Sequence, residues 1–203
     1  PVLQQEVPNA TCLAAEDQPT PKCDALLMGC GIAENDDTYA DMMRLKATDA
    51  CQVWDAGALN LLAGHPQQLG ARAVITPHAG EAARLLGWEI PAVLSDKLGA
   101  AEALRAKYGC NVVLKSAVTV MLTADGQQCA LNAVGSPALA KGGSGDALAG
   151  ILASLLGQGL PMFDAMRAAC LWLGLAGIAA GKRCGVRAAL TGDVIDSLGA
   201  CEG

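Results

Sequence analysis

Apolar and polar residues alternate along this chain in two periods, one typical of strands and the other of helices. Strand-like apolar runs follow Asp24 and occur within residues 52–55, 73–76, 111–123 and 128–131. Helical spacing occurs within residues 36–47, 95–107, 145–156, 161–180 and 191–198, and helices are also expected after Asp55 and by Gly80. This order predicts a single α/β domain over residues 1–203, with a central, largely parallel sheet flanked by helices on both faces.

The sequence also predicts an irregular N-terminal segment and one hairpin turn. Residues 1–23 are polar and rich in proline, so we expect an irregular segment with at most one short strand, at 11–14. Asp125 and Gly126 are typical of a hairpin turn between the last two strands.

Residues 132–159 pass from a polar, glycine-rich loop directly into an apolar helix. Gly142, Gly143 and Gly145 permit a tight turn and a close approach of ligand to backbone, and Ser144 is a candidate N-cap. The helix would end near Gly157 and bury one apolar face, formed by Leu148, Ile151, Leu152, Leu155 and Leu156.

The start of this helix is suited to an anion. Its unpaired N–H groups and the positive end of its dipole would face a phosphate. Asp146, in the first turn, is compatible with three roles: a base for a nucleophilic hydroxyl, a metal ligand, or an acidic residue that favours the helix N-terminus. The spacing excludes a Walker loop and a dinucleotide fingerprint.

Asp55 and His78 each follow a buried strand. A carboxylate at the carboxyl end of such a strand is where α/β folds place chemistry, but Asp55 is equally typical of a helix cap. His78 lies between Pro77 and Gly80, which favours a ligand-facing position over a structural one. His65, in a polar turn, carries no functional prediction.

Composition narrows the classes of partner. The chain is 52% hydrophobic but 3% aromatic and carries a net charge of −6, with no long basic run, so nucleic acid is not an expected partner. No apolar run reaches the roughly eighteen residues of a membrane span, and residues 1–10 lack the pattern of a signal peptide, so we expect a cytoplasmic protein without membrane contact. The nine scattered cysteines, Cys30 and Cys129 included, are interpreted as reduced packing residues rather than zinc ligands.

The Gly-Ser-Gly-Asp sequence at residues 143–146 resembles the anion-hole signature of the ribokinase-like superfamily, and within it the ADP/ATP-dependent NAD(P)H-hydrate dehydratases. Three other segments carry this resemblance: Gly-Cys-Gly-Ile at 29–32, Asp-Ala-Gly-Ala-Leu-Asn at 55–60 and Thr-Pro-His-Ala-Gly-Glu-Ala-Ala-Arg-Leu-Leu at 76–86. Lys-Ser-Ala-Val-Thr at 115–119 is similar to the family's nucleotide loop. The resemblance covers about residues 24–198.

The sequence also departs from the family pattern. Gly57 stands where a second carboxylate is expected, and Cys30 where a proline is expected. Ser116 and Val118 replace glycines, so either this loop is shifted or those glycines serve close approach. A histidine near Leu173 and an acid near residue 178 are absent, and the family's upstream strand–helix unit with its Tyr-Gly-Ala loop is not in this sequence.

The resemblance implies a ribokinase-like fold and the dehydration of hydrated NADH or NADPH (NADHX, NADPHX) through phosphorylation and elimination. It implies ADP or ATP with Mg²⁺ as cofactors, Asp146 as the catalytic residue, and no metal ligand set that the sequence identifies. The implied substrate-binding residues are Gly31, Asp55, Asn60, His78 and Asp146. The implied nucleotide-binding residues are Lys115, Ser116, Ala117, Val118, Thr119, Asn132, Gly142, Gly143, Ser144 and Gly145.

Two other functions are compatible with the sequence: a superfamily kinase for a vitamin-precursor alcohol, and a nucleotide-binding module without turnover. The Thr-Pro-His segment favours the dehydratase. The compact, acidic sequence without a transit peptide is typical of a bacterial protein, and the resemblance implies that bacterial members of the family use ADP rather than ATP. The apolar, alanine-rich helix at 161–180 indicates a homo-oligomer, which the resemblance implies is a tetramer.

Overall fold

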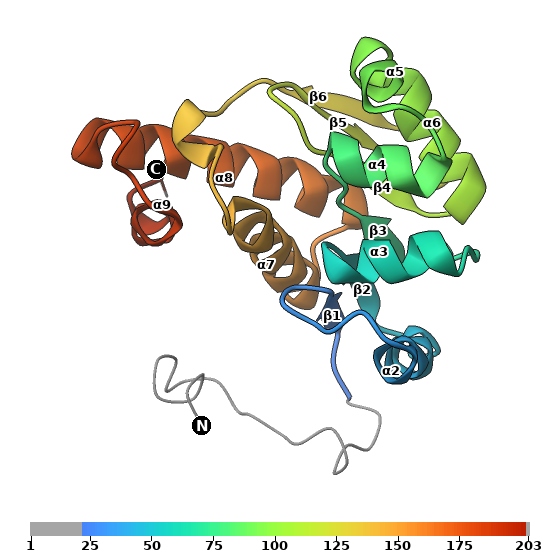
Figure 1. Ribbon diagram of the computed structural model, residues 1–203. Helices are drawn as coiled ribbons and strands as arrows, with labels where there is room; N and C mark the ends of the chain where they lie inside the picture. The colour runs from blue at the N-terminus through green and yellow to red at the C-terminus, as the bar shows by residue number, and fades with distance from the viewer. Residues whose placement is uncertain (1–21, 202–203) are drawn as a thin grey trace.

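Six strands form one mixed sheet in the computed structural model, which describes residues 22–201 (Figure 1). They lie side by side in chain order: β1 (Ala25–Met28), β2 (Cys51–Trp54), β3 (Ala73–Ile75), β4 (Asn111–Leu114), β5 (Thr119–Leu122) and β6 (Cys129–Asn132). Strands β1 to β4 are parallel, and β5 and β6 extend the sheet with antiparallel pairings. The predicted α/β class with a largely parallel sheet is confirmed.

Alternate residues of the central strands point to opposite faces of the sheet, and both faces are buried. On β2, Trp54 joins one apolar cluster and Val53 the other, and Ile75 and Val74 divide in the same way on β3. All four side chains are inaccessible to solvent. Burial on both faces explains why these strands are continuous apolar runs in the sequence rather than alternating ones.

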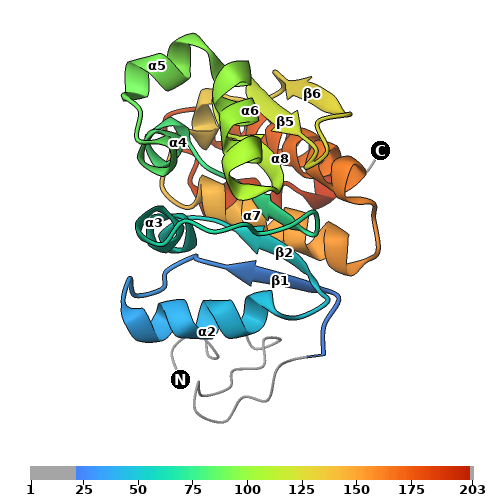
Figure 2. The same cartoon turned by 90° about the vertical axis from the view of Figure 1, so that its right-hand side faces the viewer.

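Helices cover both faces of the sheet (Figures 1 and 2). The connections between the parallel strands lie on one face and contain α2 (Asp36–Lys46), α3 (Gly57–Gly64), α4 (Ala79–Leu86), α5 (Ile90–Ser95) and α6 (Lys97–Tyr108). The other face carries α7 (Ser144–Gly157), α8 (Met162–Cys184) and α9 (Thr191–Asp196). Short 3-10 helices are η2 (Pro137–Leu139) and η3 (Gly199–Cys201). Because the parallel strands follow one another in order, right-handed crossovers place all their helices on the same face.

Capping chemistry corrects one helix boundary. The helix predicted over residues 95–107 begins at Lys97, because the Asp96 carboxylate accepts the N–H of Gly99 at 2.8 Å and is the N-cap. Ser95 instead ends α5, a helix that the sequence pattern did not predict. Two adjacent polar residues can both cap, and only the backbone path selects between them.

Two other sequence predictions concern the N-terminal segment and the cysteines. The strand predicted at residues 11–14 lies outside the described residues. Within residues 22–201 no disulfide is present, as the scattered cysteines predict.

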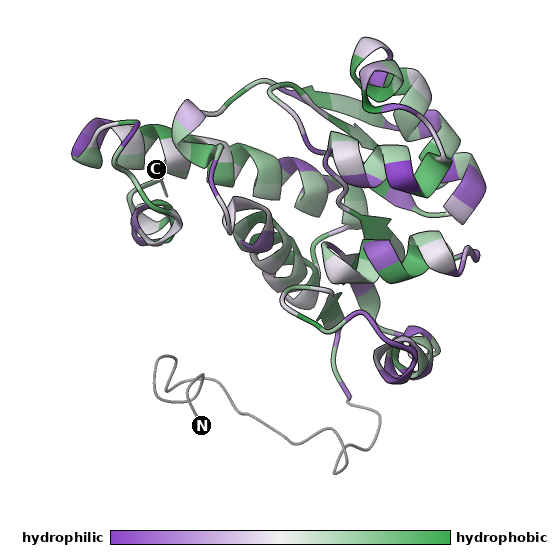
Figure 3. Ribbon diagram, viewed as in Figure 1, coloured by the Kyte–Doolittle hydropathy of each residue, from purple (hydrophilic) through white to green (hydrophobic). Residues whose placement is uncertain are grey.

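The 23 residues of α8 cross the second face of the sheet as a core helix. By length and composition, α8 is long and apolar enough to span a membrane, and an 18-residue window of it has a mean hydropathy of 1.4. The expectation that no apolar run reaches this length is therefore wrong. In the protein, 44% of that window is buried, and small residues such as Ala165, Ala169 and Ala176 allow α8 to pack closely on α7, β5 and β6. Figure 3 shows the predominantly apolar ribbons of α7 and α8.

Candidate active site

The candidate site lies where the parallel strands end, opposite the start of α7. Gly29 follows β1, Asp55 follows β2, His78 lies three residues beyond β3 and Lys115 follows β4. An isolated parallel bridge between His78 and Lys115 continues the pairing of β3 with β4 beyond the regular strands. The topology therefore brings Gly29 and three polar residues from four segments to one edge of the sheet, the usual ligand edge of α/β folds.

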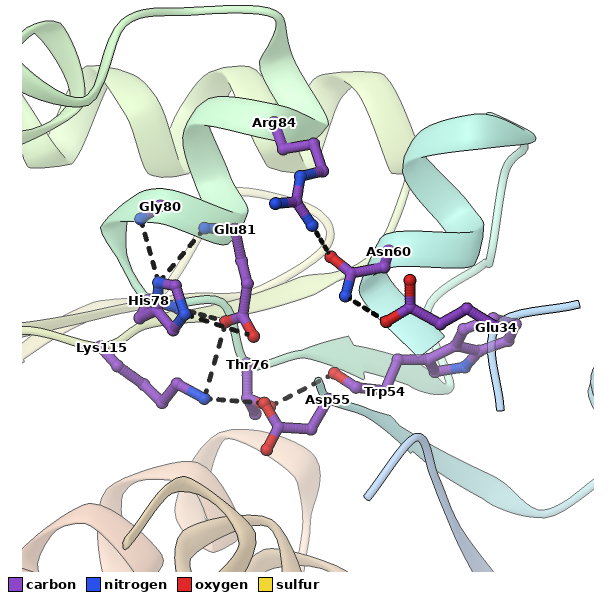
Figure 4. A network of polar contacts seen from close by, with 10 residues as sticks. All are labelled: Glu34, Trp54, Asp55, Asn60, Thr76, His78, Gly80, Glu81, Arg84 and Lys115. Atoms are coloured by element: carbon purple, nitrogen blue, oxygen red, sulfur yellow. Dashed lines mark hydrogen bonds and ion pairs between the residues drawn. The ribbon is translucent and has the colours of Figure 1, made fainter. Parts of the chain in front are cut away.

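Asp55 and Lys115 form a largely buried ion pair at the centre of this edge (Figure 4). The Asp55 Oδ1 atom accepts hydrogen bonds from Lys115 Nζ at 2.7 Å and from Thr76 Oγ1 at 2.8 Å. Asp55 is 1% exposed, and Lys115 Nζ also lies 3.9 Å from Glu81 Oε2. A carboxylate this deeply buried requires such partners, so its position is fixed before any ligand binds.

The backbone around Asp55 is unusually close-packed. A Cβ atom on Gly29, which has φ of +122°, would lie 1.7 Å from the Asp55 carbonyl oxygen. Ala56 has φ of +47°, the one positive value at a non-glycine residue within residues 22–201. At Gly57 a Cβ would lie 2.9 Å from Ile32 Cγ1, so the second carboxylate of the family pattern has no room in this conformation. Backbone strain of this kind is concentrated at functional sites.

His78 is the N-cap of α4 and forms a capping box with Glu81. Its Nδ1 atom accepts the N–H groups of Gly80 at 3.0 Å and Glu81 at 3.2 Å, and Glu81 Oε2 accepts the N–H of His78 at 2.7 Å. With Nδ1 acting as an acceptor, the proton of the neutral imidazole resides on Nε2. The side chain is 60% exposed, and its Nε2 atom lies 3.5 Å from Glu81 Oε1. The substrate-binding role stays a prediction beside this observed capping role.

Asn60 belongs to a separate polar chain at the rim of the site (Figure 4). Its Nδ2 atom donates to Glu34 Oε1 at 2.6 Å, and its Oδ1 atom accepts from the guanidinium of Arg84. Gly31, with φ of +69° and open space around its Cα, is exposed on the neighbouring turn. These residues of the predicted substrate side therefore come from α3, α4 and the turn after β1.

The segment that we call the phosphate loop, residues 141–145, leads into α7. Gly143, with φ of +86°, is the N-cap, and no side chain caps this helix. The prediction that Ser144 is the cap is therefore wrong: Ser144 is the first helical residue, and its buried Oγ atom has no hydrogen-bond partner within residues 22–201. Glycine in the left-handed conformation starts the helix one residue earlier and leaves the first-turn N–H groups without a side-chain acceptor.

The phosphate loop meets the buried ion pair directly. A Cβ atom on Gly145 would lie 3.1 Å from Lys115 Nζ and 3.6 Å from Asp55 Oδ2. This contact explains the glycine at position 145, since any side chain there would press on the lysine. It also places the positive end of the α7 dipole beside the lysine, which favours an anion in front of both.

Asp146 and Cys30 complete the centre of the site. Donor atoms of Cys30, Asp55 and Asp146 all lie within 4.8 Å of one another. Burial first, then hydrogen bonding to Asp146 and the negative charges of Asp146 and Asp55, raise the pKa of the Cys30 thiol to about 12. The thiol therefore stays protonated near neutral pH, and the sequence interpretation of Cys30 as a packing residue missed its place beside the predicted catalytic carboxylate.

This cluster could hold a metal ion through its carboxylates only. Mg²⁺ prefers oxygen ligands and retains several waters, so a protonated thiol is unsuitable. Asp55 already shares one oxygen with Lys115, whereas Asp146 is exposed and can approach a cation carried by phosphate groups. The residues fit an ion held mainly by a nucleotide.

The loop after β4 carries the other predicted nucleotide-binding residues. Thr119 Oγ1 donates to the carbonyl of Ser116 at 3.2 Å, and Ser116 Oγ donates to the carbonyl of Val118, while Ala117 is exposed. Neither Ser116 nor Val118 has a positive φ, so the loop adopts a conformation open to any residue. The glycines of the family pattern are not needed here for backbone conformation.

Asn132 lies beside this loop because it pairs with Thr119 across β5 and β6. Its amide donates to the carbonyl of Val134 at 2.9 Å. A surface cavity of about 380 Å³ between β6 and α8 reaches Asn132, and a second of about 340 Å³ lies near Asn111 and Phe163, away from Asp55 and Asp146. Thr119 and Asn132 thus adjoin one another, whereas Lys115 pairs with Asp55 at the centre of the edge.

Comparisons with known proteins identify the family to which this chain is similar. A sequence model of the NAD(P)H-hydrate dehydratase family matches residues 2–199. A bifunctional NAD(P)H-hydrate repair enzyme of Vibrio cholerae is 43% identical over 151 residues, which cover 74% of this chain and 30% of the relative. An ADP-dependent (S)-NAD(P)H-hydrate dehydratase of Neisseria meningitidis is 37% identical over 163 residues, which cover 77% of this chain and 54% of the relative.

A solved structure shows the same fold. The ADP/ATP-dependent NAD(P)H-hydrate dehydratase of Bacillus subtilis, co-crystallised with ATP and Mg²⁺ and soaked with CoA, superposes with a TM-score of 0.86 at 25% identity. The match covers 98% of this chain and 75% of that one. This chain spans 30% to 54% of the length of the curated relatives named above. From its sequence and its fold, the chain belongs to the NAD(P)H-hydrate dehydratase family.

Proposed function

We propose that this chain dehydrates NADHX and NADPHX to NADH and NADPH with ADP as the phosphoryl donor. The observation that carries the proposal is the meeting of Asp146, on the first turn of an uncapped helix, with the buried pair Asp55–Lys115. This arrangement sets N–H donors without a side-chain cap, a lysine and an exposed carboxylate around one point. Phosphoryl transfer to a hydroxyl requires those three kinds of group.

The chemistry follows from that arrangement. The hydrated nicotinamide ring carries a hydroxyl on C6. Asp146 takes the hydroxyl proton as the oxygen attacks the terminal phosphorus of ADP, a P–O bond forms, and AMP leaves. Phosphate then leaves C6 as a proton leaves C5, which restores the C=C bond of the nicotinamide. The N–H groups of Gly143 to Gly145 stabilise the negative charge on the phosphoryl group in the transition state of the transfer.

The two substrates divide between the two sides of the site. Residues 115–119 and Asn132, which adjoin one another across β5 and β6, hold the nucleotide in this proposal. Gly31, Asp55, Asn60 and His78 line the side of the nicotinamide. A Mg²⁺ ion carried by the phosphates would neutralise their charge, with Asp146 as the nearest exposed carboxylate.

We also propose a homo-oligomer, a tetramer by family resemblance, located in the cytoplasm. Leu131 on β6 is 66% exposed, and Leu171 and Leu175 on α8 are 44% and 38% exposed. Large apolar side chains gathered on an edge strand and its neighbouring helix support burial against another copy. Light scattering that shows a concentration-independent monomer would exclude the oligomer.

The activity is tested by incubating the protein with NADHX, ADP and Mg²⁺ while NADH absorbance is recorded. We expect NADH and AMP in equal amounts, with ATP a weaker donor. The alternative vitamin-precursor kinase would consume nucleotide with its own alcohol and form no NADH. A module without turnover would bind ADP and form neither product.

A further inference from the structure

The phosphate loop is fastened to the C-terminal part of the chain by side-chain hydrogen bonds. Thr191 Oγ1 donates to the carbonyl of Gly142 at 2.7 Å. Lys141 Nζ donates to the carbonyl of Arg187 at 2.7 Å and to that of Ala189. These contacts join positions 46 to 49 residues apart in sequence, so they hold the loop against the segment that leads into α9.

Thr191 also packs on the residue at which the backbone turns into α7. Its Oγ1, Cγ2 and Cβ atoms lie 3.4 to 3.6 Å from the position of a Cβ on Gly143. Gly143 has φ of +86°, and glycine loses more conformational freedom on ordering than any other residue. A contact at this residue therefore restricts the loop where it would otherwise be most mobile.

Lys141 places a cationic side chain at the edge of the loop. Both of its hydrogen-bond acceptors are neutral carbonyls, and it forms no ion pair within residues 22–201. The N–H groups at the start of α7 have no side-chain cap. The Ser144 N–H donates to the Lys141 carbonyl at 3.3 Å, so the loop presents its remaining first-turn N–H groups next to a cation. Its shape depends on the side-chain hydrogen bonds of Lys141 and Thr191.

We propose that Lys141 and Thr191 are positioning residues that hold the phosphate loop in the conformation that binds the transferred phosphoryl group. The proposal rests on the proposed function, because it assigns that loop to the nucleotide. Thr191 acts through the backbone of Gly142 and Gly143, and Lys141 acts through the carbonyls of Arg187 and Ala189, rather than on the substrates. Donors fixed in advance avoid the cost of ordering the loop when the nucleotide arrives.

The test compares four variants of the full chain. Thr191→Val removes the hydroxyl and keeps the shape, Thr191→Ser keeps the hydroxyl, and Lys141→Met keeps the aliphatic stem. The matched control is Arg183→Met, since Arg183 joins α8 to α9 through the carbonyl of Asp193 at 2.9 Å and does not contact the loop. The Kd of Mg·ADP, the thermal midpoint, and amide hydrogen exchange of residues 142–146 without nucleotide are measured for each.

We expect Thr191→Val to raise the Kd of Mg·ADP about five- to tenfold, as expected for one lost hydrogen bond, and Lys141→Met, which loses two, to raise it by at least that factor. Exchange at residues 142–146 should accelerate by a similar factor in the nucleotide-free protein. Thr191→Ser should stay within about twofold of the wild type on both measures. Arg183→Met should lower the thermal midpoint without changing the Kd of Mg·ADP or the amide exchange of residues 142–146.

The proposal is overturned if Thr191→Val and Lys141→Met lower the thermal midpoint but leave the Kd and the loop exchange unchanged, as Arg183→Met does. If one of the two variants does not fold, the other decides. A wild-type protein that binds no adenine nucleotide contradicts the proposed function instead. In that case the exchange rates alone decide whether Lys141 and Thr191 order the loop.

Discussion

The two sides of the site are built from different groups. The phosphate loop offers backbone N–H donors that no side chain caps. None of its residues, 141–145, is a carboxylate that would repel an anion; the next carboxylate along the sequence is Asp146. The opposite side is made of side chains already bonded to one another, as in the hydrogen bond of Thr76 to Asp55 and the chain through Asn60 to Arg84.

This difference teaches which side can adapt. Groups that are paired before binding must exchange partners when a ligand arrives, which favours selectivity. Open donors of a rigid loop need only a phosphate of the right charge, whatever molecule carries it. We therefore expect variants of the loop to affect all phosphoryl donors equally, and variants of the paired side to separate one alcohol substrate from another.

The largest expected effect comes from Asp146→Asn, at the junction of the two sides. Turnover should fall about 10²- to 10⁴-fold, the range expected for loss of a general base. The Kd of ADP should stay equal or decrease, because a negative charge near phosphate is removed. The control is Asp164→Asn, at an exposed position near the start of α8. If Asp146→Asn weakened ADP binding but kept the turnover rate, Asp146 would not be the catalytic base.

Next in size is the contrast between Gly29→Ala and Gly31→Ala, two glycines with positive φ on one turn. Gly29→Ala places a Cβ 1.7 Å from the Asp55 carbonyl oxygen and should cost about 3–5 kcal/mol. At Gly31, where no atom lies within 4 Å of the new Cβ, only the conformational cost of about 1–2 kcal/mol remains. Urea unfolding of both variants measures this, and equal losses would contradict the close packing behind Asp55.

A smaller effect separates the two roles of His78. His78→Ala should raise the KM of NADHX more than that of ADP and cost about 1 kcal/mol of stability, because the N-cap of α4 is lost. His78→Ser keeps a capping oxygen and removes the imidazole, so it should restore stability but not the KM. Should His78→Ser restore both, the residue acts only as a cap; equal changes in both KM values would reverse the assignment of the two sides.

The smallest effect concerns the thiol at the centre of the site. Since the pKa of Cys30 is raised to about 12, only about one part in ten thousand is thiolate at pH 8, and alkylation should be slow until the pH approaches that value. Exposed Cys129 serves as the internal comparison by mass spectrometry. Asp146→Asn should accelerate alkylation of Cys30, because it removes a neighbouring charge; labelling of Cys30 as fast as that of Cys129 would contradict the geometry.

Much of the fold could be predicted because its strands and helices have clear periodicity. The continuous apolar runs of β2, β3 and β4 indicated strands buried on both faces, and the glycine-rich start of α7 was recognisable from spacing alone. The boundaries were less certain. A left-handed glycine at Gly143 competes with Ser144 for the cap, and the choice depends on the path of the whole loop.

Contacts between distant segments could not be predicted in this way. Asp55 and Lys115 are 60 residues apart, and their pairing follows from the register of parallel strands. Thr191 and Gly142 are 49 residues apart, and a resemblance confined to short segments carries no signal for that bond. Cys30 was placed correctly on its turn, but its nearness to Asp146 depends on how α7 meets β1.

The most direct test of the account follows one oxygen atom. NADHX prepared with ¹⁸O in its C6 hydroxyl is mixed with excess protein, ADP and Mg²⁺ for a single turnover, and the released phosphate and AMP are analysed by mass spectrometry. Transfer of a phosphoryl group to that hydroxyl, followed by cleavage of the C6–O bond, predicts the label in inorganic phosphate and none in AMP. Label released into water, with NADH formed, would contradict phosphorylation at this site.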